Sequence, residues 1–171
     1  MSEVAPWALD GVSLGERTLE IGPGPGFTSE AVRPLTPDLV CAELDARLAR
    51  ELAGRLGNPH ARVLRAHASA LPLRDGAFDS VVAFTMLHHV TPESAQDALF
   101  AEAARVLRPG GVFAGVDSLN SAVFRLLHWR DPMVIVPPDG LLERLQRAGF
   151  ARAEITVRRR DFRFRAWRAQ R

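Results

Sequence analysis

The chain has no lysine, a single cysteine, and no hydrophobic run long enough to cross a membrane. Cys41 cannot form an internal disulfide and supplies no metal cluster, which excludes disulfide-stapled scaffolds and zinc ribbons. A membrane helix needs about 18 consecutive apolar residues, and the first 20 residues lack the basic start and apolar segment of a secretory signal. We therefore expect a cytoplasmic protein with no membrane partner.

Glycine and proline occur at ordinary levels, with 13 and 12 residues among 171, and no segment is low in complexity. Composition therefore excludes disordered, collagen-like and repeat proteins. With 47% hydrophobic and 25% charged residues, the length favours one compact domain with a substantial core. We expect residues 1–16 to be a short N-terminal extension and residues 17–171 to be that domain.

All 22 basic residues are arginines, and they are unevenly distributed. Residues 1–140 hold 12 arginines against 17 acidic residues, a net charge of −5, whereas residues 141–171 hold 10 against three, a net charge of +7. From Phe162 on, apolar residues alternate with Arg163 and Arg165, which predicts a strand with one buried face. Its other face has three interpretations: a solvated surface, a contact with acidic residues of a second copy, or a surface for anions or nucleic acid.

Short apolar runs alternate with amphipathic segments, a pattern typical of a parallel sheet wound with helices. In the second helix Asp45 is a candidate N-cap, leucines form one stripe, and Gly57 ends the helix. The last two strand candidates are too close for a parallel crossover and predict an antiparallel hairpin. Strands are expected at 18–21, 39–44, 62–65, 80–84, 112–116, 154–157 and 162–166, and helices at 28–35, 45–57, 91–109 and 139–149.

Three glycines, Gly22, Gly24 and Gly26, lie between the first strand and the first helix. Glycines in such a loop let a ligand approach the backbone, and the helix N-terminal amides face that ligand. Glu43 ends the second strand 17 residues after Gly26, where a carboxylate can accept bonds from both hydroxyls of a ribose. Together these features predict a site for a nucleotide-like ligand; the alternative is a tight turn beside a surface acid.

The spacing of the loop discriminates between nucleotides. A dinucleotide fingerprint, Gly-x-Gly-x-x-Gly, needs its third glycine at the position of Phe27. Glu20 precedes the loop and would place negative charge close to a pyrophosphate, whereas it would attract the ammonium of an amino-acid moiety. The pattern therefore favours a cationic ligand and disfavours a nicotinamide-dependent oxidoreductase.

Four stretches carry a resemblance to a known family: LEIGPGPG at 19–26, AELD at 42–45, ALPLRDGAFDSVVAFTMLHHV at 70–90 and RVLRPGG at 105–111. In this order and spacing, the chain from Thr18 onward resembles class I S-adenosylmethionine-dependent methyltransferases. The resemblance implies S-adenosyl-L-methionine as cofactor. It also implies an α/β fold, a single Rossmann-like three-layer domain with a mostly parallel seven-stranded sheet and a C-terminal antiparallel hairpin.

The resemblance further implies which residues contact the cofactor. The methionine end is implied to lie against Glu20, Gly22, Pro23, Gly24 and Gly26. The ribose is implied to lie at Glu43, the adenine at Leu44, His67 and Ala68, and the methyl-donor pocket at Phe84, Thr85 and Met86.

His67 departs from the family pattern, in which an acid at this position accepts a hydrogen bond from the adenine amino group. A neutral imidazole can accept through one nitrogen, and protonation removes that ability. We therefore expect cofactor binding to weaken below about pH 6.

Transfer of a methyl group from a sulfonium requires mainly that the acceptor and the methyl carbon be held about 3 Å apart. A hydroxyl or a protonated amine is helped by a base, and the candidates are His88 and, less favoured, His89, just after the fourth strand. The alternative is that this pair caps or packs the junction. No cysteine, third histidine or acid stands at ligand spacing around the pair, so we expect no metal.

Further residues are candidates for the acceptor side of the site. Asp117, Ser118 and Asn120 follow the fifth strand, and Trp7, His128, Trp129 and Arg130 are candidate lid residues. We expect a small organic acceptor, methylated at oxygen or nitrogen mainly by proximity and orientation. The alternatives are a non-catalytic cofactor-binding or scaffold subunit, and a nucleic-acid methyltransferase that uses the Arg-rich end. The short acceptor elements leave open a site completed by the second subunit of a homodimer.

Overall fold

The computed structural model describes residues 4–57, 60–120 and 133–170. Its helices are α1 (Val4–Leu9), α2 (Phe27–Val32), α3 (Ala46–Leu56), α4 (Glu93–Val106) and α6 (Leu141–Arg147), with 3₁₀ turns η1 (Arg33–Leu35) and η2 (Leu87–His89). Its strands are β1 (Arg17–Ile21), β2 (Asp38–Glu43), β3 (Ala61–Arg65), β4 (Phe78–Phe84), β5 (Leu107–Ser118), β6 (Phe150–Val157) and β7 (Asp161–Arg168).

All seven strands belong to one sheet in the order β3-β2-β1-β4-β5-β7-β6. Strands β1 to β5 are parallel, and β7 runs antiparallel between β5 and β6. The predicted fold class is thus confirmed, including the closing hairpin. Its chain reversal follows from the short link between β6 and β7, since only an antiparallel pair can be joined over so few residues.

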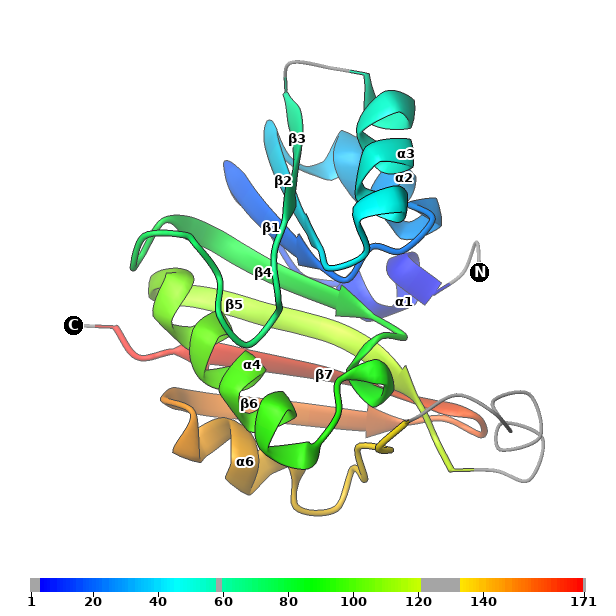
Figure 1. Cartoon of the computed structure of the whole chain (residues 1–171). Coiled ribbons are helices and arrows are strands. Elements are labelled where there is room, and N and C mark those ends of the chain that lie inside the picture. Colours follow the sequence, from blue (N-terminus) through cyan, green and yellow to red (C-terminus); the bar gives the residue numbers. More distant parts are fainter. Residues whose placement is uncertain (1–3, 58–59, 121–132, 171) are drawn as a thin grey trace.

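Helices cover both faces of the sheet (Figure 1), with α4 and α6 on one side and α1, α2 and α3 on the other. The central strand β4 shows why both covers are needed. Val81 and Ala83 belong to the core beneath α4 and α6, whereas Val82 and Phe84 belong to the core beneath the other three helices. Because successive side chains of a strand point to opposite faces, a strand buried on both sides is apolar throughout.

Helix α3 begins and ends where the sequence predicts. The Asp45 carboxylate accepts hydrogen bonds from the backbone N–H groups of Arg47 and Leu48, at 2.8 and 2.9 Å. These bonds lower the pKa of Asp45, although the side chain is fully exposed. Gly57 closes the helix in the left-handed conformation, with φ +41°. Helix α3 thus connects the end of β2 to the start of β3.

Several predicted boundaries differ from the structure, most of them because the strands are longer than expected. Two differences at helix ends have a local cause. Helix α4 ends at Val106 rather than at 109, because Leu107 is extended and pairs with Phe78 as the first residue of β5. A register shift then accommodates Pro109, which cannot donate to a strand ladder. Helix α6 begins after Gly140, whose φ is +84°, one residue beyond the predicted Asp139.

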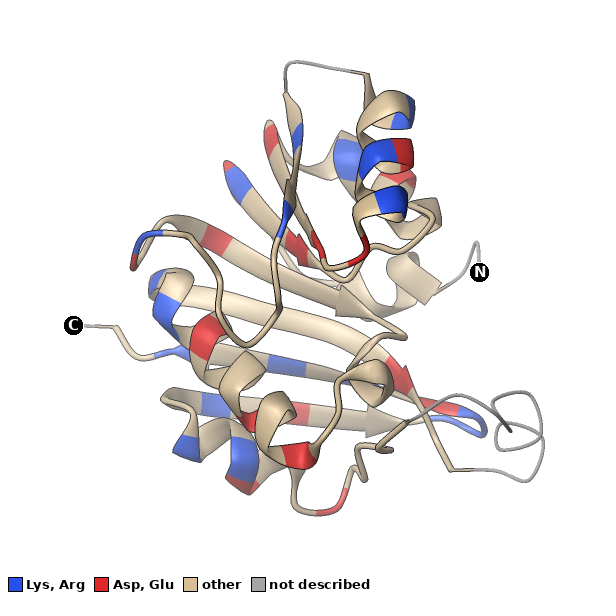
Figure 2. Ribbon diagram, viewed as in Figure 1, with Lys and Arg blue, Asp and Glu red and all other residues tan. Residues whose placement is uncertain are grey.

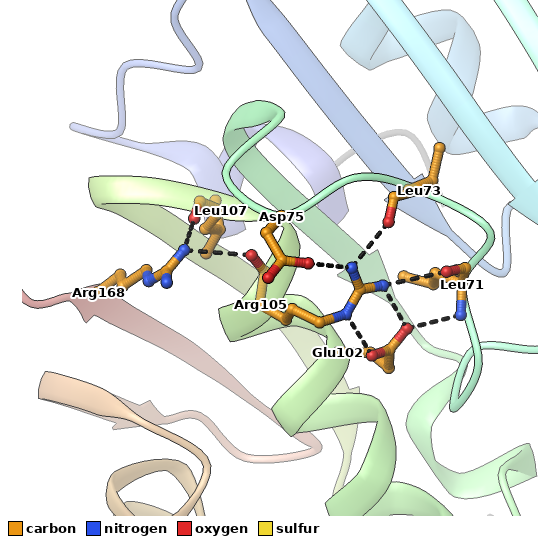
Figure 3. A network of polar contacts seen from close by, with 7 residues as sticks. All are labelled: Leu71, Leu73, Asp75, Glu102, Arg105, Leu107 and Arg168. Carbon is orange, nitrogen blue, oxygen red and sulfur yellow. Dashed lines mark hydrogen bonds and ion pairs between the residues drawn. The ribbon is translucent and has the colours of Figure 1, made fainter.

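Arg105, on α4, holds the segment that leads into β4 (Figure 3). Its guanidinium donates to the carbonyl groups of Leu71 and Leu73, and it pairs with Glu102 and Asp75 at 2.6 Å each. Glu102 also accepts the backbone N–H of Leu71. These charge-assisted bonds hold the loop between β3 and β4 in place. The same loop contains Ala66, His67 and Ala68, which line the cavity.

The Arg-rich C-terminal part contacts its own chain. Arg163 donates to the carbonyl of Trp7, and the guanidinium of Arg158 lies 3.5 Å from the centroid of the Trp7 ring. Arg165 donates to the carbonyl of Asp10. Figure 2 shows arginines and acidic residues interspersed over this part of the molecule. Trp7 thus packs against the β6–β7 hairpin region.

No described helix is long and apolar enough to cross a membrane.

Candidate functional site

A cavity of about 480 Å³ opens at the carboxyl ends of the parallel strands. The strand order reverses between β1 and β4, which are neighbours in the sheet. Strands β2 and β3 lie on the β1 side, and β5 lies on the β4 side. Ligands of open α/β sheets bind at this switch point, where consecutive loops separate. The cavity is lined by Gly22, Gly24, Ala42, Glu43, Leu44, Leu48, Ala66, His67, Ala68, Met86, His89, Val90 and Thr91.

The three glycines after β1 are each required for a different reason. All have positive φ, at +63°, +55° and +88° for Gly22, Gly24 and Gly26. A Cβ on Gly22 would lie 2.7 Å from Cε of Met86, and one on Gly26 would lie 2.3 Å from Cδ1 of Leu52. A Cβ on Gly24 would meet nothing within 4 Å. Gly24 is therefore the glycine whose bare backbone faces open space.

Glu43 joins the end of β2 to this loop. Its carboxylate accepts the backbone N–H of Gly24 at 3.0 Å through Oε2 and that of Asp45 at 2.9 Å through Oε1. The side chain is buried and yet lines the cavity. Each carboxylate oxygen has a second acceptor position, so the group can still accept hydroxyl donors from a ligand.

Glu20 lies below the loop and does not line the cavity. Its carboxylate accepts the Thr28 hydroxyl at 2.6 Å and faces the Cys41 thiol, with Sγ 3.7 Å away. Burial raises the pKa of Glu20, and the hydrogen bonds from Ser29, Thr28 and Cys41 oppose that rise. The pKa of Cys41 is raised in turn by burial and by the neighbouring carboxylate, so this thiol is a poor nucleophile at neutral pH.

Glu20 should make the stability of the protein depend on pH. Its raised pKa means that the folded state keeps a proton that the unfolded chain releases, so the free energy of unfolding falls as pH rises above the ordinary glutamate value. Glu20→Gln removes the titration and should give a flatter profile in urea unfolding between pH 4.5 and 8. Exposed Glu16 supplies the control, since Glu16→Gln should retain the wild-type slope. Parallel profiles for wild type and E20Q would contradict the expectation.

One wall of the cavity is apolar. Leu44 is 53% exposed beside Glu43 and lines the cavity. Leu48, on the first turn of α3, extends this wall, and Met86 lies opposite, packed over Gly22. Ala66, His67 and Ala68, which follow β3, also line the cavity.

The two histidines after β4 have different surroundings. Nδ1 of His88 lies 2.5 Å from Oδ1 of Asp117, and the His88 backbone N–H donates to the same carboxylate. Both side chains are buried, and neither lines the cavity. His89 is exposed and lines it. The pair of His88 and Asp117 therefore ties η2 to the carboxyl end of β5.

The structure brings together half of the predicted site. The predicted residues on the cavity wall are Gly22, Gly24, Glu43, Leu44, His67, Ala68, Met86 and His89, whereas Glu20, Pro23, Gly26, Phe84, Thr85 and His88 lie off it. Thr85 has a left-handed backbone, with φ +50°, and donates from its N–H to Val116. The sequence analysis missed Ala42, Leu48, Ala66, Val90 and Thr91. Leu48 carried one signal: it is the residue of the α3 stripe nearest the end of β2. His128, Trp129 and Arg130 lie outside the described residues. Among the described side chains, no group of His, Cys, Asp and Glu could hold a metal ion.

The family model described as "Methyltransferase domain" matches residues 19–115, more than half of the chain. The chain belongs to the methyltransferase family. The matched segment runs from β1 to β5 and includes the glycine loop, Glu43 and the turn at His67, so every part of the cavity lies within it. Proteins of this family use S-adenosylmethionine as cofactor.

Two curated relatives carry O-methyltransferase names. The methyltransferase is 37% identical over 101 residues to malonyl-[acyl-carrier protein] O-methyltransferase of Geobacter sulfurreducens, covering 57% of this chain and 37% of the relative. It is 35% identical over 115 residues to demethylluteothin O-methyltransferase of Streptomyces thioluteus, covering 64% and 50%. The chain thus spans half or less of the length of these relatives.

Solved structures share the whole fold at low sequence identity. The YcgJ protein of Bacillus subtilis superposes with a TM-score of 0.83 at 16% identity, over 100% of both chains. Phosphoethanolamine N-methyltransferase 2 of Haemonchus contortus, solved in complex with S-adenosyl-L-methionine, gives 0.78 at 14% identity over 99% of this chain and 52% of the other. The cavity of the methyltransferase has the features that such a cofactor needs: bare backbone, a fixed carboxylate and an apolar wall.

Proposed function

We propose that this methyltransferase transfers a methyl group from S-adenosyl-L-methionine to an oxygen or nitrogen of a small organic acceptor. The observation that carries the proposal is the carboxylate of Glu43, which is buried, tied to Gly24, and adjacent to the exposed Leu44. Glu43 binds the sugar hydroxyls, Leu44 packs against the base, and the backbone at Gly24 admits the methionine portion.

The charge of the cavity supports a cationic cofactor. Among the described residues that line it there is one carboxylate, that of Glu43, and no arginine, although the chain has 22. A nicotinamide dinucleotide would bring a pyrophosphate next to this carboxylate without a cation to balance it. A positively charged sulfonium is attracted instead.

The chain contributes mainly position to the reaction. The cofactor supplies a methyl group on a positively charged sulfur, an electrophile that needs no further activation. Gly22 and Met86 close the cavity between the loop and β4, and His89, Val90 and Thr91 line its far side. Holding an acceptor in line with the methyl group accounts for a rate enhancement of many orders of magnitude without a catalytic group.

The acceptor enters from the β4 and β5 side of the cavity. The two relatives described above are O-methyltransferases by name, which favours an oxygen nucleophile over nitrogen. Ser118 is the last residue of β5 and Asn120 follows two residues later; both are candidate acceptor contacts. The role of His88 as a base remains a prediction; its hydrogen bond with Asp117 supports a positioning role for the η2 turn.

Glu43→Gln should cost most of the cofactor affinity. The amide nitrogen of a glutamine must face one of two backbone donors, Gly24 or Asp45, so a charge-assisted bond is lost together with the sugar contact. Such a bond contributes about 1.5–3 kcal/mol, and we expect binding of S-adenosyl-L-homocysteine in calorimetry to weaken about 30-fold or more. Glu51→Gln, on the exposed side of α3, makes the same chemical change and should leave binding unaltered. Equal affinities for both variants would exclude Glu43 from the site.

Three readouts separate the competing functions. A thermal shift with S-adenosyl-L-homocysteine and none with NAD supports the proposal, and the reverse overturns it in favour of an oxidoreductase. Turnover of hydroxyl, carboxyl or amine acceptors distinguishes an enzyme from a cofactor-binding scaffold subunit. Salt-sensitive binding of RNA or DNA that is lost on charge reversal at Arg158, Arg159 and Arg160 would point to nucleic-acid methylation.

A further inference from the structure

We propose that His67 presents an N–H donor to the base of the cofactor, so that this site recognises the purine through a ring nitrogen and not through its 6-amino group. The inference rests on the proposed function, because it needs S-adenosylmethionine in the cavity. It concerns which edge group of the base the protein reads.

The strand order places His67 beside the base. The glycine loop follows β1, Glu43 ends β2, and His67 follows β3, and these three strands are neighbours in the sheet. Glu43 pairs in register with Arg65, and the N–H of Ala66 donates to the Glu43 carbonyl at 3.0 Å. His67 therefore lies one residue beyond the sugar site, on the cavity wall next to Ala68. A ligand that spans the edge with its sugar at Glu43 and its amino-acid end at Gly24 has its base here.

A tight turn determines which nitrogen of the neutral imidazole carries the proton. The N–H of Ala70 donates to the carbonyl of His67 at 3.0 Å, which closes a turn over four residues. Within it, the backbone N–H of Ser69 donates to Nδ1 of His67 at 3.2 Å, and the Ser69 hydroxyl lies 2.7 Å from the same nitrogen. A backbone N–H is only a donor, so Nδ1 must hold its lone pair. The proton of the neutral ring is then on Nε2, and the outer nitrogen is a donor. Under this inference the imidazole does not accept from the base, so the weakening of cofactor binding below about pH 6 that an accepting ring predicts is not expected.

An aspartate at this position would behave differently. Short acidic and amide side chains accept the N–H two residues ahead in turns of this kind. An aspartate bound to Ser69 through one oxygen keeps a second oxygen as an acceptor, which suits an exocyclic amino group. An asparagine bound in the same way presents its amide N–H₂ instead. Replacement of His67 by either residue thus preserves the turn and changes only the group that faces the ligand. Aspartate presents an acceptor, whereas asparagine presents a donor, as histidine does.

Two ligands and three proteins test the inference. The ligands are S-adenosyl-L-homocysteine and its analogue with hydrogen in place of the 6-amino group, and the proteins are wild type, His67→Asn and His67→Asp. We expect wild type and H67N to bind the two ligands with dissociation constants within about twofold in calorimetry. H67D should prefer the amino ligand by about tenfold, the value of one hydrogen bond to a charged acceptor. A thermal melt of each variant verifies that it folds.

The outcomes are distinct. Wild type that loses tenfold or more in affinity without the amino group, as H67D does, would show that His67 accepts from this group and overturn the inference. The ring can also be examined directly, since nitrogen chemical shifts in NMR separate the two tautomers; Nδ1–H in the ligand-free protein would overturn the inference even if a variant failed to fold. Failure of both ligands to bind wild type would instead refute the proposed function, and the inference with it.

Discussion

Gly24→Ala should abolish most cofactor binding while the protein remains folded. The residue has φ +55°, and its added Cβ would contact no protein atom within 4 Å. The backbone penalty for alanine in this conformation is about 1–2 kcal/mol, which a domain of this size tolerates. The methyl group, however, projects from the loop that Glu43 holds, where a ligand packs against bare backbone. We expect the affinity for S-adenosyl-L-homocysteine to fall about 30-fold in calorimetry, the result of an overlap costing about 2 kcal/mol.

Gly140→Ala is the matched control for this variant. Gly140 has φ +84° and likewise has no atom within 4 Å of an added Cβ, but it precedes α6, away from the cavity. Gly140→Ala should lower the free energy of unfolding in urea by a similar amount. It should bind S-adenosyl-L-homocysteine with the affinity of wild type. If the two variants lost stability and affinity in parallel, the effect at Gly24 would come from the backbone alone, and the loop would not be the ligand's contact.

Gly115→Ala should produce the largest loss of stability. Gly115 lies on β5, between β4 and β7, and an added Cβ would be 2.1 Å from the carbonyl oxygen of Ala83 and 2.6 Å from Cζ of Phe164. The Ala83 carbonyl belongs to a strand backbone in the middle of the sheet, which cannot move aside to relieve the overlap as a flexible side chain can. We expect the free energy of unfolding to fall by about 3 kcal/mol, which corresponds to a decrease in the melting temperature of about 9 °C.

The control, Gly54→Ala, should change stability in the opposite direction. Gly54 is on the exposed side of α3, and a Cβ there would meet nothing within 4 Å. Alanine favours the helix over glycine by about 0.5–1 kcal/mol, so this variant should melt slightly above wild type. Unfolding of G115A within 0.5 kcal/mol of wild type would contradict the close approach of β4, β5 and β7.

The regions predicted correctly from the sequence are those governed by local chemistry. Asp45 caps α3 through amides two and three residues ahead, and Gly57 closes the helix against Ala53, so the pattern alone locates the element. The hairpin of β6 and β7 follows from a short connection. The alternation of Phe162 and Phe164 with arginines correctly indicated which face is buried.

Both Glu20 and Glu43 were predicted to contact the ligand, Glu20 at its methionine end and Glu43 at its ribose, but only Glu43 lines the cavity. Glu20 is followed in β1 by Ile21 and pairs with Cys41, so its side chain remains within the sheet layers and bonds to Thr28. Glu43 is the last residue of β2 and emerges at the edge. One residue of difference in strand position decides which carboxylate lines the cavity, and no spacing in the sequence reports it.

By itself, the sequence determined the order of strands and helices, the glycine loop and the acid that follows it, because each depends on residues a few positions apart. Only the tertiary structure decided the partners that are distant along the chain. Asp117 holds His88 from 29 residues away, and the chain around Trp7 receives Arg163 from the far end of the molecule. Such contacts depend on how strands are ordered and packed in space, and therefore only the folded chain determines which groups line the cavity.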